Sequence, residues 1–521
     1  MARIARNTFI FSVATGLSRI AGLGREIVAS SYFATSGAFS AFTIAFQVPN
    51  LIRSLFADAA LSAAFVPVFT ELLEKDKRKE AFQLASTLFF LIAGVLGLIS
   101  AAFMVAAPHV MPLFTGDTFD SQLDELTSGL SRVLFPIVVL LGLNGLLQGI
   151  LNAYDHFSVP AISPVVWNLV ILAFLIAGRG WFEGDEQLYA YAIGVLVGTL
   201  VQLLMLVPVF RRLDFQVVPT FTPRDDKVKR VLILMLPVTI GLGLINFNLL
   251  INSVLGSLVS ENAPRAIDAA FRIYMLPQGM FSVAVATVLF PTLSRLAARG
   301  DKAGLRGMTA QGMRQIFLLL VPAAACTLVL AEPITRLIYE HGDFGPQDTD
   351  RVAEALFWFS FSLPLSGVNL LLTRTFFSLQ RPWIPTGLAV ANLAVNLVVS
   401  VALYKPFGIA GIVIGTAAGS LTTTLTQAYF LRGELEGRLE ARETASSLAR
   451  MVIAAALLAG VAYGVWWGLD DLIGDSVAAQ AIAVSTALIV GLATYAAAVL
   501  AQRVPEAVYI RGVIARRFYP R

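Results

Sequence analysis

Charged side chains are scarce in this sequence. Of its 521 residues only 14% are Asp, Glu, Lys or Arg, whereas 57% are hydrophobic. An ordinary soluble domain carries about 25% charged residues. Apolar runs of about 18 or more residues follow one another along the whole chain, which is the pattern of membrane-spanning helices. The composition excludes an ordinary soluble protein and predicts an all-α integral membrane protein.

Residues typical of metal sites and of catalysis are also few. The one cysteine, Cys326, excludes a disulfide within the chain. The three histidines, His109, His156 and His341, lie far apart in the sequence. We find no zinc-ligand pattern, phosphate-binding loop or dinucleotide fingerprint. We therefore expect a protein that is not an enzyme, has no cofactor and does not itself hydrolyse ATP.

The apolar runs predict fourteen membrane-spanning helices. They lie at about residues 7–32, 38–60, 81–108, 129–153, 160–178, 188–210, 231–257, 266–293, 312–337, 352–379, 384–403, 408–431, 448–468 and 478–501. With the N-terminus inside, the cytoplasmic segments hold most of the 38 Lys and Arg residues, and the outside loops hold few, among them Arg265. This asymmetry is a positive-inside signal, so both termini are expected in the cytoplasm. The net charge of +4 is then explained by the membrane topology and by contact with anionic lipid, rather than by binding to nucleic acid.

The two halves of the chain resemble each other. Gly142–Pro160 aligns without gaps with Gly367–Pro385, and Asn144 is matched by Asn369. The repeat spans six helices, an even number, so the two copies have the same orientation. Such parallel repeats imply a pseudo-twofold axis along the membrane normal, with a substrate site between two lobes.

The repeat predicts three parts. Residues 1–212 form an N-lobe of six helices and residues 213–431 form a C-lobe of six. Residues 432–521 hold a charged linker, two extra helices and a cytoplasmic tail. Two lobes with a site between them favour an alternating-access carrier over a pore.

Four arginines lie inside the predicted spans, namely Arg19, Arg25, Arg53 and Arg272. An arginine at mid-membrane costs about 2.5–3.5 kcal/mol on insertion scales, so such residues face a protein interior or a watery cavity. The planar guanidinium fork binds phosphate and carboxylate groups in a bidentate manner. The four arginines therefore predict a cationic cleft that holds an anionic headgroup.

Polar residues recur along the predicted helix at 38–60 at spacings of three or four, which places them on one face. They are Ser36, Ser40, Thr43, Gln47, Asn50, Ser54 and Asp58. In lipid such a face must meet water or protein. A water-filled cavity and a dry polar seam against another helix are both open interpretations. We place Asn50 and Asp58 in the cleft as supporting residues.

The first predicted helix supplies two more supporting residues, Ser18 and Glu26. Glu26 follows Arg25 directly, so an ion pair between these two side chains is an alternative to a cleft role for Arg25. Extension of Arg25 toward the outer surface is a second alternative.

Asp268 is the supporting residue of the eighth predicted helix, four residues before Arg272. At this spacing the two side chains can form an ion pair on one helix, which is the alternative to a cleft role for Arg272. Arg314 lies near the end of a predicted span, and we expect its side chain to extend to the membrane interface.

No metal site is assigned. Asn246, Asn392 and Asn396 are weak candidates for a cation site built from oxygen ligands. Interhelical hydrogen bonds are the alternative role for these amides.

Several motifs are similar to those of one known family. Ser18–Glu26 (SRIAGLGRE) and Phe46–Asp58 (FQVPNLIRSLFAD) resemble the first- and second-helix motifs of the MurJ (MviN) family. Similar segments follow at Ile150–Tyr154 and His341–Phe344. The resemblance extends over all the predicted helices.

The resemblance implies a flippase for lipid II, the undecaprenyl-pyrophosphate-linked peptidoglycan precursor, in the bacterial inner (cytoplasmic) membrane. It implies membership of the multidrug/oligosaccharidyl-lipid/polysaccharide (MOP) exporter superfamily, and a groove for the lipid tail along the last two helices. The family's cleft arginines fall on Arg19, Arg25, Arg53 and Arg272. Its second-helix acid falls on Asp58, where a glutamate is usual, and Ser40 stands where some relatives have an acid.

The expected partners are lipid II and membrane lipids, with cell-wall synthesis proteins as further candidates and no nucleic acid. A pyrophosphate offers many acceptor oxygens that several arginines can share. The candidate energy sources are the membrane potential and a Na⁺ or H⁺ gradient, each worth about 2.3 kcal/mol per charge per 100 mV.

Other functions stay open at this stage. A flippase for another polyprenyl-pyrophosphate oligosaccharide, a cation-coupled drug exporter, a non-transporting scaffold of cell-wall synthesis and a membrane transferase are the alternatives. Four cleft arginines disfavour the export of cationic drugs, and a scaffold would not need such costly residues in a cleft.

Overall fold

The computed structural model describes residues 2–56, 59–154, 156, 158–210, 213, 218, 220–437, 439–474 and 476–518. Within these ranges the chain is helical and contains no strand. The predicted all-α fold class is therefore confirmed. Asp58, which the sequence places in the cleft, lies outside the described residues.

The chain divides into two compact units. The first comprises Met1–Arg265 together with His341–Phe344, and the second comprises Ala266–Glu340 together with Gly345–Arg521. The predicted lobe boundaries at residues 212 and 431 concern the repeat rather than this division, and they stay a prediction.

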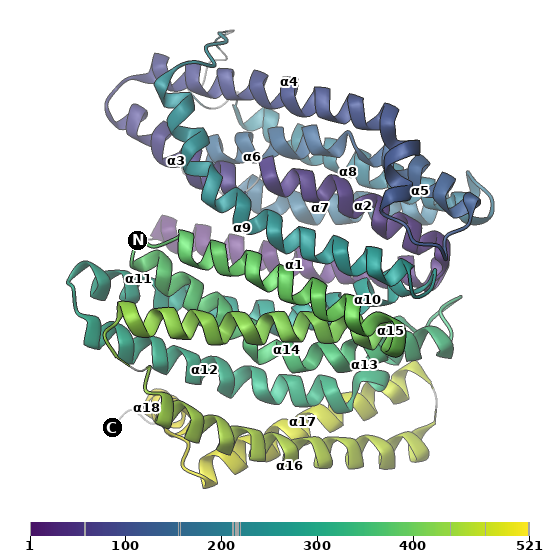
Figure 1. The fold of residues 1–521 in the computed structure, drawn as a ribbon, viewed down its shortest axis with the longest axis vertical. Helices are drawn as coiled ribbons and strands as arrows, with labels where there is room; N and C mark the ends of the chain where they lie inside the picture. Colours follow the sequence, from purple (N-terminus) through teal and green to yellow (C-terminus); the bar gives the residue numbers. More distant parts are fainter. Residues whose placement is uncertain are drawn as a thin grey trace. The chain divides into compact units, whose positions relative to one another are not determined.

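Nine helices build the first unit's described part (Figure 1). They are α1 (Ala2–Phe33), α2 (Gly37–Phe56), α3 (Ala59–Glu74), α4 (Arg78–Val110), α5 (Ser121–Leu134), α6 (Ile137–Ala153), α7 (Ser158–Ala177), α8 (Gln187–Phe210) and α9 (Asp226–Ser257). Short 3₁₀ turns lie at Met111–Leu113, Gly178–Gly180 and Gly184–Glu186. Within this unit α2 packs against α5 and α9, and α7 packs against both α1 and α8.

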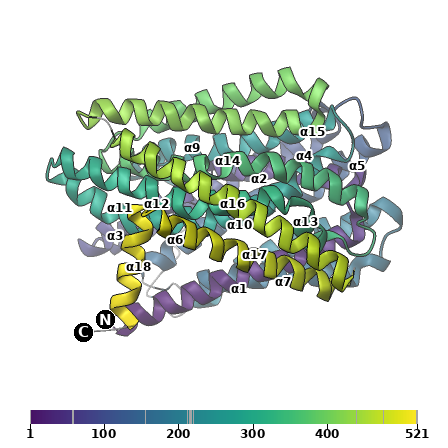
Figure 2. The same ribbon diagram turned by 90° about the horizontal axis from the view of Figure 1, so that it is seen from below.

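The remaining helices are α10 (Ala263–Pro277), α11 (Val283–Ala298), α12 (Lys302–Val329), α13 (Ala331–Tyr339), α14 (Pro346–Ser378), α15 (Trp383–Glu434), α16 (Ala441–Ile473), α17 (Val477–Ala501) and α18 (Pro505–Phe518). A π-helical turn at Gln278–Ser282 joins α10 to α11. The two extra C-terminal helices of the sequence analysis are α16 and α17. They lie side by side in Figure 1 and again in Figure 2.

Ten described helical stretches are long and apolar enough to cross a membrane. The predicted number of fourteen is not confirmed. One reason is α15, which runs through two predicted spans, 384–403 and 408–431, as a single helix with a kink. Gly408 forms the kink with φ 56° and ψ −130°, a backbone conformation that suits glycine because it has no Cβ.

Local side-chain chemistry sets several helix starts. The Asp120 carboxylate accepts from the backbone N–H of Leu123 at 2.8 Å before α5, and Asp225 accepts from Lys227 at 2.9 Å before α9. Each satisfies an N–H that has no partner inside the helix. Large apolar side chains then fill the interior of the first unit, including Phe39, which is 1% exposed.

The His341–Phe344 motif forms a turn that belongs to the first unit. The backbone N–H of Asp343 donates to the Ser31 carbonyl on α1 at 2.8 Å, and Phe344 is buried. Gly342 has φ +65°, and a Cβ there would collide with the Ser31 carbonyl oxygen. The close backbone approach therefore requires glycine at this position.

Candidate functional site

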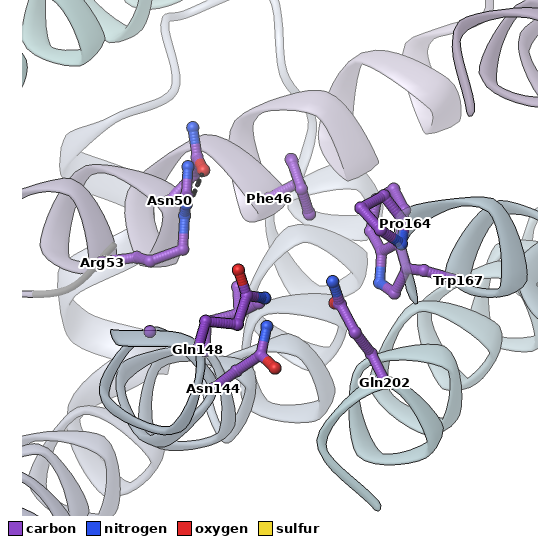
Figure 3. A pocket seen from close by; sticks show the side chains of 10 residues that line it. Phe46, Asn50, Arg53, Asn144, Gln148, Pro164, Trp167 and Gln202 are labelled. Atoms are coloured by element: carbon purple, nitrogen blue, oxygen red, sulfur yellow. Dashed lines mark hydrogen bonds between the residues drawn. The ribbon is translucent and has the colours of Figure 1, made fainter. Parts of the chain in front are cut away.

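A pocket of about 440 Å³ lies inside the first unit, between α2, α6, α7 and α8 (Figure 3). Its volume is toward the low end of the roughly 300–1,000 Å³ typical of small-molecule sites. One guanidinium and four carboxamides supply its polar groups, namely Arg53, Asn50, Asn144, Gln148 and Gln202. Phe46, Pro164 and Trp167 supply much of its apolar wall. This mixture of a mostly apolar wall and a few polar groups is typical of a binding site.

Arg53 reaches the pocket from α2. Its Nε donates to Asn50 Oδ1 at 3.0 Å, one helical turn earlier, and the bond is drawn in Figure 3. Asn50 Nδ2 in turn donates to Asn246 Oδ1 on α9 at 2.8 Å. These two bonds orient the guanidinium along its own helix. The structure therefore places Arg53 and Asn50, both expected in a cleft, at the wall of one pocket.

The polar face of α2 serves two purposes. Near its start Ser40 and Thr43 are buried. Ser40 Oγ accepts a hydrogen bond from the backbone N–H of Arg265 at 3.2 Å. Thr43 Oγ1 donates to the Phe39 carbonyl at 2.9 Å. This part is a dry seam. Near its end Asn50 and Arg53 line the pocket. The start of α2 is therefore a dry seam and its end lines a pocket, while a water-filled cavity stays a prediction.

Three carboxamides face the pocket from the opposite side. Asn144 and Gln148 project from α6 and Gln202 projects from α8 toward the same space (Figure 3). Gln202 Nε2 donates to Ser163 Oγ at 3.3 Å. Asn144 is only 3% exposed, yet its Oδ1 has no hydrogen-bond partner among the described residues. A buried acceptor left without a donor costs about 1–3 kcal/mol. This oxygen is itself buried, and it is the amide nitrogen that Figure 3 shows turned toward the pocket.

Trp167 connects the pocket to the first helix. Its indole Nε1 donates to Thr199 Oγ1 at 3.0 Å, which fixes the ring. The guanidinium carbon of Arg25 lies 5.0 Å from the centre of the same ring. This distance is within the range of a cation–π interaction. Arg25 therefore lies directly behind a wall residue of the pocket.

Arg25 belongs to a buried charged cluster. Arg25 is 8% exposed and Glu26 is 3% exposed, and Arg25 Nη2 lies 3.7 Å from Glu26 Oε2. The ion pair considered from the sequence is therefore present. It is longer than a charge-assisted hydrogen bond of about 2.7–2.9 Å. Arg25 Nε is buried and has no hydrogen-bond partner within the described part of the chain, so this guanidinium keeps a donor for another ligand.

Arg265 completes the cluster, although it is not among the site residues that the sequence predicts. It is 1% exposed, and its Nη2 lies 2.5 Å from Glu26 Oε1 and donates to Ser30 Oγ at 2.9 Å. Its guanidinium also stacks on Phe39, 4.0 Å from the ring centre. The prediction of a loop at Arg265 is wrong, because α10 begins at Ala263 and already includes this residue.

A sequence signal for Arg265 did exist. Arg265, Asp268 and Arg272 are spaced at i, i+3 and i+7, which places them on one face of a helix that starts earlier than predicted.

Ser18 and Arg19 lie elsewhere on α1. Arg19 is exposed and does not line the described pocket. The Ser18 carbonyl accepts from Asn168 Nδ2 on α7 at 3.3 Å, which helps attach α1 to α7. Of the four predicted cleft arginines, the structure brings Arg25 and Arg53 to one neighbourhood.

Arg272 lies in the second unit, on α10. Its Nε donates to Asp268 Oδ2 at 2.8 Å, and the two side chains are 38% and 15% exposed. The i, i+4 pair expected as an alternative is therefore formed.

The candidate cation-site amides take part in hydrogen bonds. Asn392 Nδ2 donates to Thr423 Oγ1 at 2.8 Å, Asn396 Oδ1 accepts from Ser400 Oγ at 3.0 Å, and Asn246 Oδ1 accepts from Asn50. Among the described residues no group of three or more His, Cys, Asp or Glu side chains is arranged to hold a metal. The cation site stays a prediction.

Arg314 is held by carboxylates, and its expected extension to the membrane interface stays a prediction. Its side chain is 12% exposed; Nη1 donates to Glu440 Oε2 at 2.7 Å and Nε donates to Glu506 Oε1. Arg314 thereby joins α12 to the segment before α16 and to α18 within the second unit.

Sequence comparisons identify the family. The family model described as "Lipid II flippase MurJ" matches residues 29–467. A probable lipid II flippase MurJ from Bdellovibrio bacteriovorus is 31% identical, with 80% of each chain covered. A lipid II flippase MurJ from Burkholderia cenocepacia is 29% identical, with 80% of this chain and 82% of the relative covered.

Solved structures share the fold. A lipid II flippase MurJ in an inward closed conformation matches with a TM-score of 0.77 and 21% identity, covering 97% of this chain and 100% of the other. An inward-facing multidrug resistance transporter of the MATE family in the MOP superfamily matches with a TM-score of 0.68 and 15% identity, covering 82% and 94%. With the family model matched over most of its length, the chain belongs to the MurJ lipid II flippase family.

Proposed function

We propose that this protein is a lipid II flippase, which carries the undecaprenyl-pyrophosphate-linked precursor from the inner to the outer leaflet of the bacterial cytoplasmic membrane by alternating access. Family membership supports transport rather than catalysis. The observation that carries the proposal is the pair of arginines, Arg25 and Arg53, around an amide-lined pocket inside a helical membrane protein. An arginine is costly in lipid unless it serves a substrate path or a partner.

Arg25 is the best placed anion ligand of the first unit. Its Nε has no partner within the described residues, and its contact with Glu26 is long at 3.7 Å. Glu26 is held more closely by Arg265. We propose that a pyrophosphate binds Arg25 once the surrounding helices move in the transport cycle, while Glu26 stays anchored by Arg265. Charge-assisted hydrogen bonds of this type are about twice as strong as neutral ones.

The remaining parts of the mechanism follow from the substrate. Protein groups replace water around the pyrophosphate and sugars, while the apolar tail stays in lipid. We propose that both termini are cytoplasmic, because most Lys and Arg residues fall in the segments on that side. The membrane potential and a Na⁺ or H⁺ gradient stay the candidate energy sources, and cell-wall synthesis proteins stay candidate partners.

Removal of either arginine tests the proposal. Hydrogen bonds to a charged group contribute about 1.5–3 kcal/mol, so Arg25→Ala and Arg53→Ala should each slow lipid II flipping in proteoliposomes by roughly 10- to 150-fold. Arg132→Ala is the matched control, because Arg132 is exposed and its Nε donates to the Met104 carbonyl at 3.0 Å. It should flip at the normal rate. Normal flipping by both pocket variants would contradict the proposal.

A further inference from the structure

Glu26 lies between two arginines of the buried cluster, and it does not contact them equally. Its Oε1 lies 2.5 Å from Arg265 Nη2, whereas its Oε2 lies 3.7 Å from Arg25 Nη2. All three side chains are buried. Charges inside a protein are screened less than charges in water, so this difference in distance is a difference in interaction energy. In this conformation the carboxylate therefore neutralises Arg265 more than it neutralises Arg25.

Arg265 is fixed at its place by contacts to α1 and α2. Its Nη2 also donates to Ser30 Oγ on α1 at 2.9 Å, and its backbone N–H donates to Ser40 Oγ on α2 at 3.2 Å. Its guanidinium carbon lies 4.0 Å from the centre of the Phe39 ring. The cluster thus contains one arginine that several groups hold beside Glu26.

Arg25 is bound less tightly than Arg265. Its contacts among the described residues are the long one to Glu26 and the one to the Trp167 ring. A guanidinium has five N–H donors, and neither of these contacts is a short hydrogen bond. Arg25 can therefore take up either the Glu26 carboxylate or another anion.

The position of Arg265 in the chain suits a contact that changes during transport. The boundary between the two compact units falls directly after Arg265, inside α10, whose remaining residues belong to the second unit. A carrier that works by alternating access moves its halves against each other. We expect the contact between Arg265 and Glu26 to change early in such a movement, because α10 continues from it into the second unit.

A change of partner by Glu26 would alter the charge that Arg25 offers. While Glu26 pairs with Arg265, the Arg25 cation can bind a pyrophosphate. Once Arg265 withdraws, Arg25 is the cation nearest to Glu26, and the carboxylate competes with the pyrophosphate for one guanidinium. This competition lowers the affinity for the pyrophosphate at the stage when the lipid has to leave.

We propose that Glu26 controls release of the pyrophosphate by exchanging partners. It pairs with Arg265 while the lipid is bound, and it transfers to Arg25 to displace the lipid. Arg265 is then a positioning residue, which acts on the anion site through Glu26. The inference rests on the proposed flippase function and adds the step that lowers the affinity of the site.

The test measures binding and flipping separately on the full-length protein. Binding of undecaprenyl pyrophosphate is measured in nanodiscs, and flipping of lipid II is measured in proteoliposomes. Glu26→Gln removes the competing charge and keeps an acceptor for Arg265. This variant should bind about tenfold more tightly than the wild type and flip about tenfold more slowly. Loss of structure does not produce tighter binding together with slower transport.

Two variants at Arg265 complete the test. Arg265→Met removes the guanidinium but keeps a long side chain, so Glu26 should pair with Arg25 and binding should weaken about tenfold. The double variant Glu26→Gln with Arg265→Met lacks both charges and should bind at least as tightly as the wild type. If Arg265→Met does not fold, Glu26→Gln and the double variant decide, because neither leaves a Glu26 carboxylate unpaired. Arg132→Ala is the control and should match the wild type in both assays.

Each result separates the exchange from the proposed function. Unchanged or weaker binding by Glu26→Gln would overturn the exchange, and so would flipping by this variant at the normal rate. A double variant that binds more weakly than the wild type would show that Arg265 does not act through Glu26. In these cases a wild type that flips lipid II leaves the proposed function standing. Failure of the wild type to flip lipid II would overturn the proposed function itself.

Discussion

Two amides that the repeat relates, Asn144 and Asn369, are in opposite situations in the two units. In the first, Asn144 Oδ1 and Arg25 Nε are buried without hydrogen-bond partners in the described chain. In the second, the repeat-related Asn369 is bonded at both ends of its amide, and Arg314 is held by two carboxylates. Open polar groups inside a membrane protein cost free energy unless a ligand satisfies them. Glu506 Oε2 and Gln427 Oε1 of the second unit are also buried without a partner among the described residues, so the contrast concerns Asn144 and Asn369 and not each unit as a whole.

Arg314→Ala should give the largest change in stability. Removal of one partner from a buried ion pair costs about 3–5 kcal/mol, because the other charge is left buried. Glu506, whose side chain is 4% exposed, would be that charge. We expect a lower melting temperature in detergent but normal flipping per folded molecule. Arg450→Ala, at an exposed arginine that bonds to the Gln502 carbonyl, is the control and should melt normally. If Arg314→Ala lost flipping while its stability was unchanged, the contrast between the units would be wrong.

Asn369→Leu and Asn144→Leu should change the free energy of unfolding by amounts that differ in sign or size. The first leaves the Thr424 hydroxyl and the Ser420 carbonyl with fewer partners, so it should destabilise the protein by about 1–3 kcal/mol. The second removes an acceptor that has no partner, so it should be neutral or slightly stabilising without ligand. Thermal unfolding of the two variants measures the difference. Equal destabilisation would show that Asn144 also has a structural role.

The smallest expected effect is on the pH dependence of stability, and it comes from one exposed carboxylate in each unit. The pKa of Glu71 is lowered by hydrogen bonds from Lys75 and then Arg230, and the pKa of Glu436 is lowered by its hydrogen bond from Lys302. A lowered folded-state pKa contributes stability that is present above the unfolded value of about 4.3 and is lost as the pH falls through the folded value. The melting temperature should therefore drop slightly below about pH 4. Glu71→Gln and Glu436→Gln should each reduce this fall in melting temperature. If the melting temperature of both variants fell with pH as steeply as that of the wild type, these two carboxylates would not be its cause.

Part of this picture is readable from the sequence. The apolar runs and the small number of charges predict the helical membrane fold. The cost of arginine in lipid selects four arginines, of which Arg53 lines the pocket and Arg25 stacks on a residue of its wall. Contacts between distant parts of the chain cannot be predicted from the sequence in the same way. Nothing local to Trp167 indicates that Arg25 stacks on it, because that contact depends on how α1 packs against α7.

Two positions show where sequence patterns mislead. Arg265 follows a short polar segment that predicts a loop, but α10 begins before it and buries it against Glu26. The sequence marks Asn144 only as a match to Asn369 in the repeat. Its role depends on which hydrogen bonds each copy forms, and identical residues in a repeat do not reveal that difference.

The most direct test of lipid II flipping through the first unit's pocket is the exposure of lipid II on the outer leaflet of intact cells. Cells depleted of this protein would be rescued with the wild type, Arg25→Ala, Arg53→Ala or Arg132→Ala. We expect exposure to fall on depletion, to return with the wild type and Arg132→Ala, and to stay low with Arg25→Ala and Arg53→Ala at equal protein levels. Full exposure in cells that carry only Arg25→Ala or only Arg53→Ala would contradict this account.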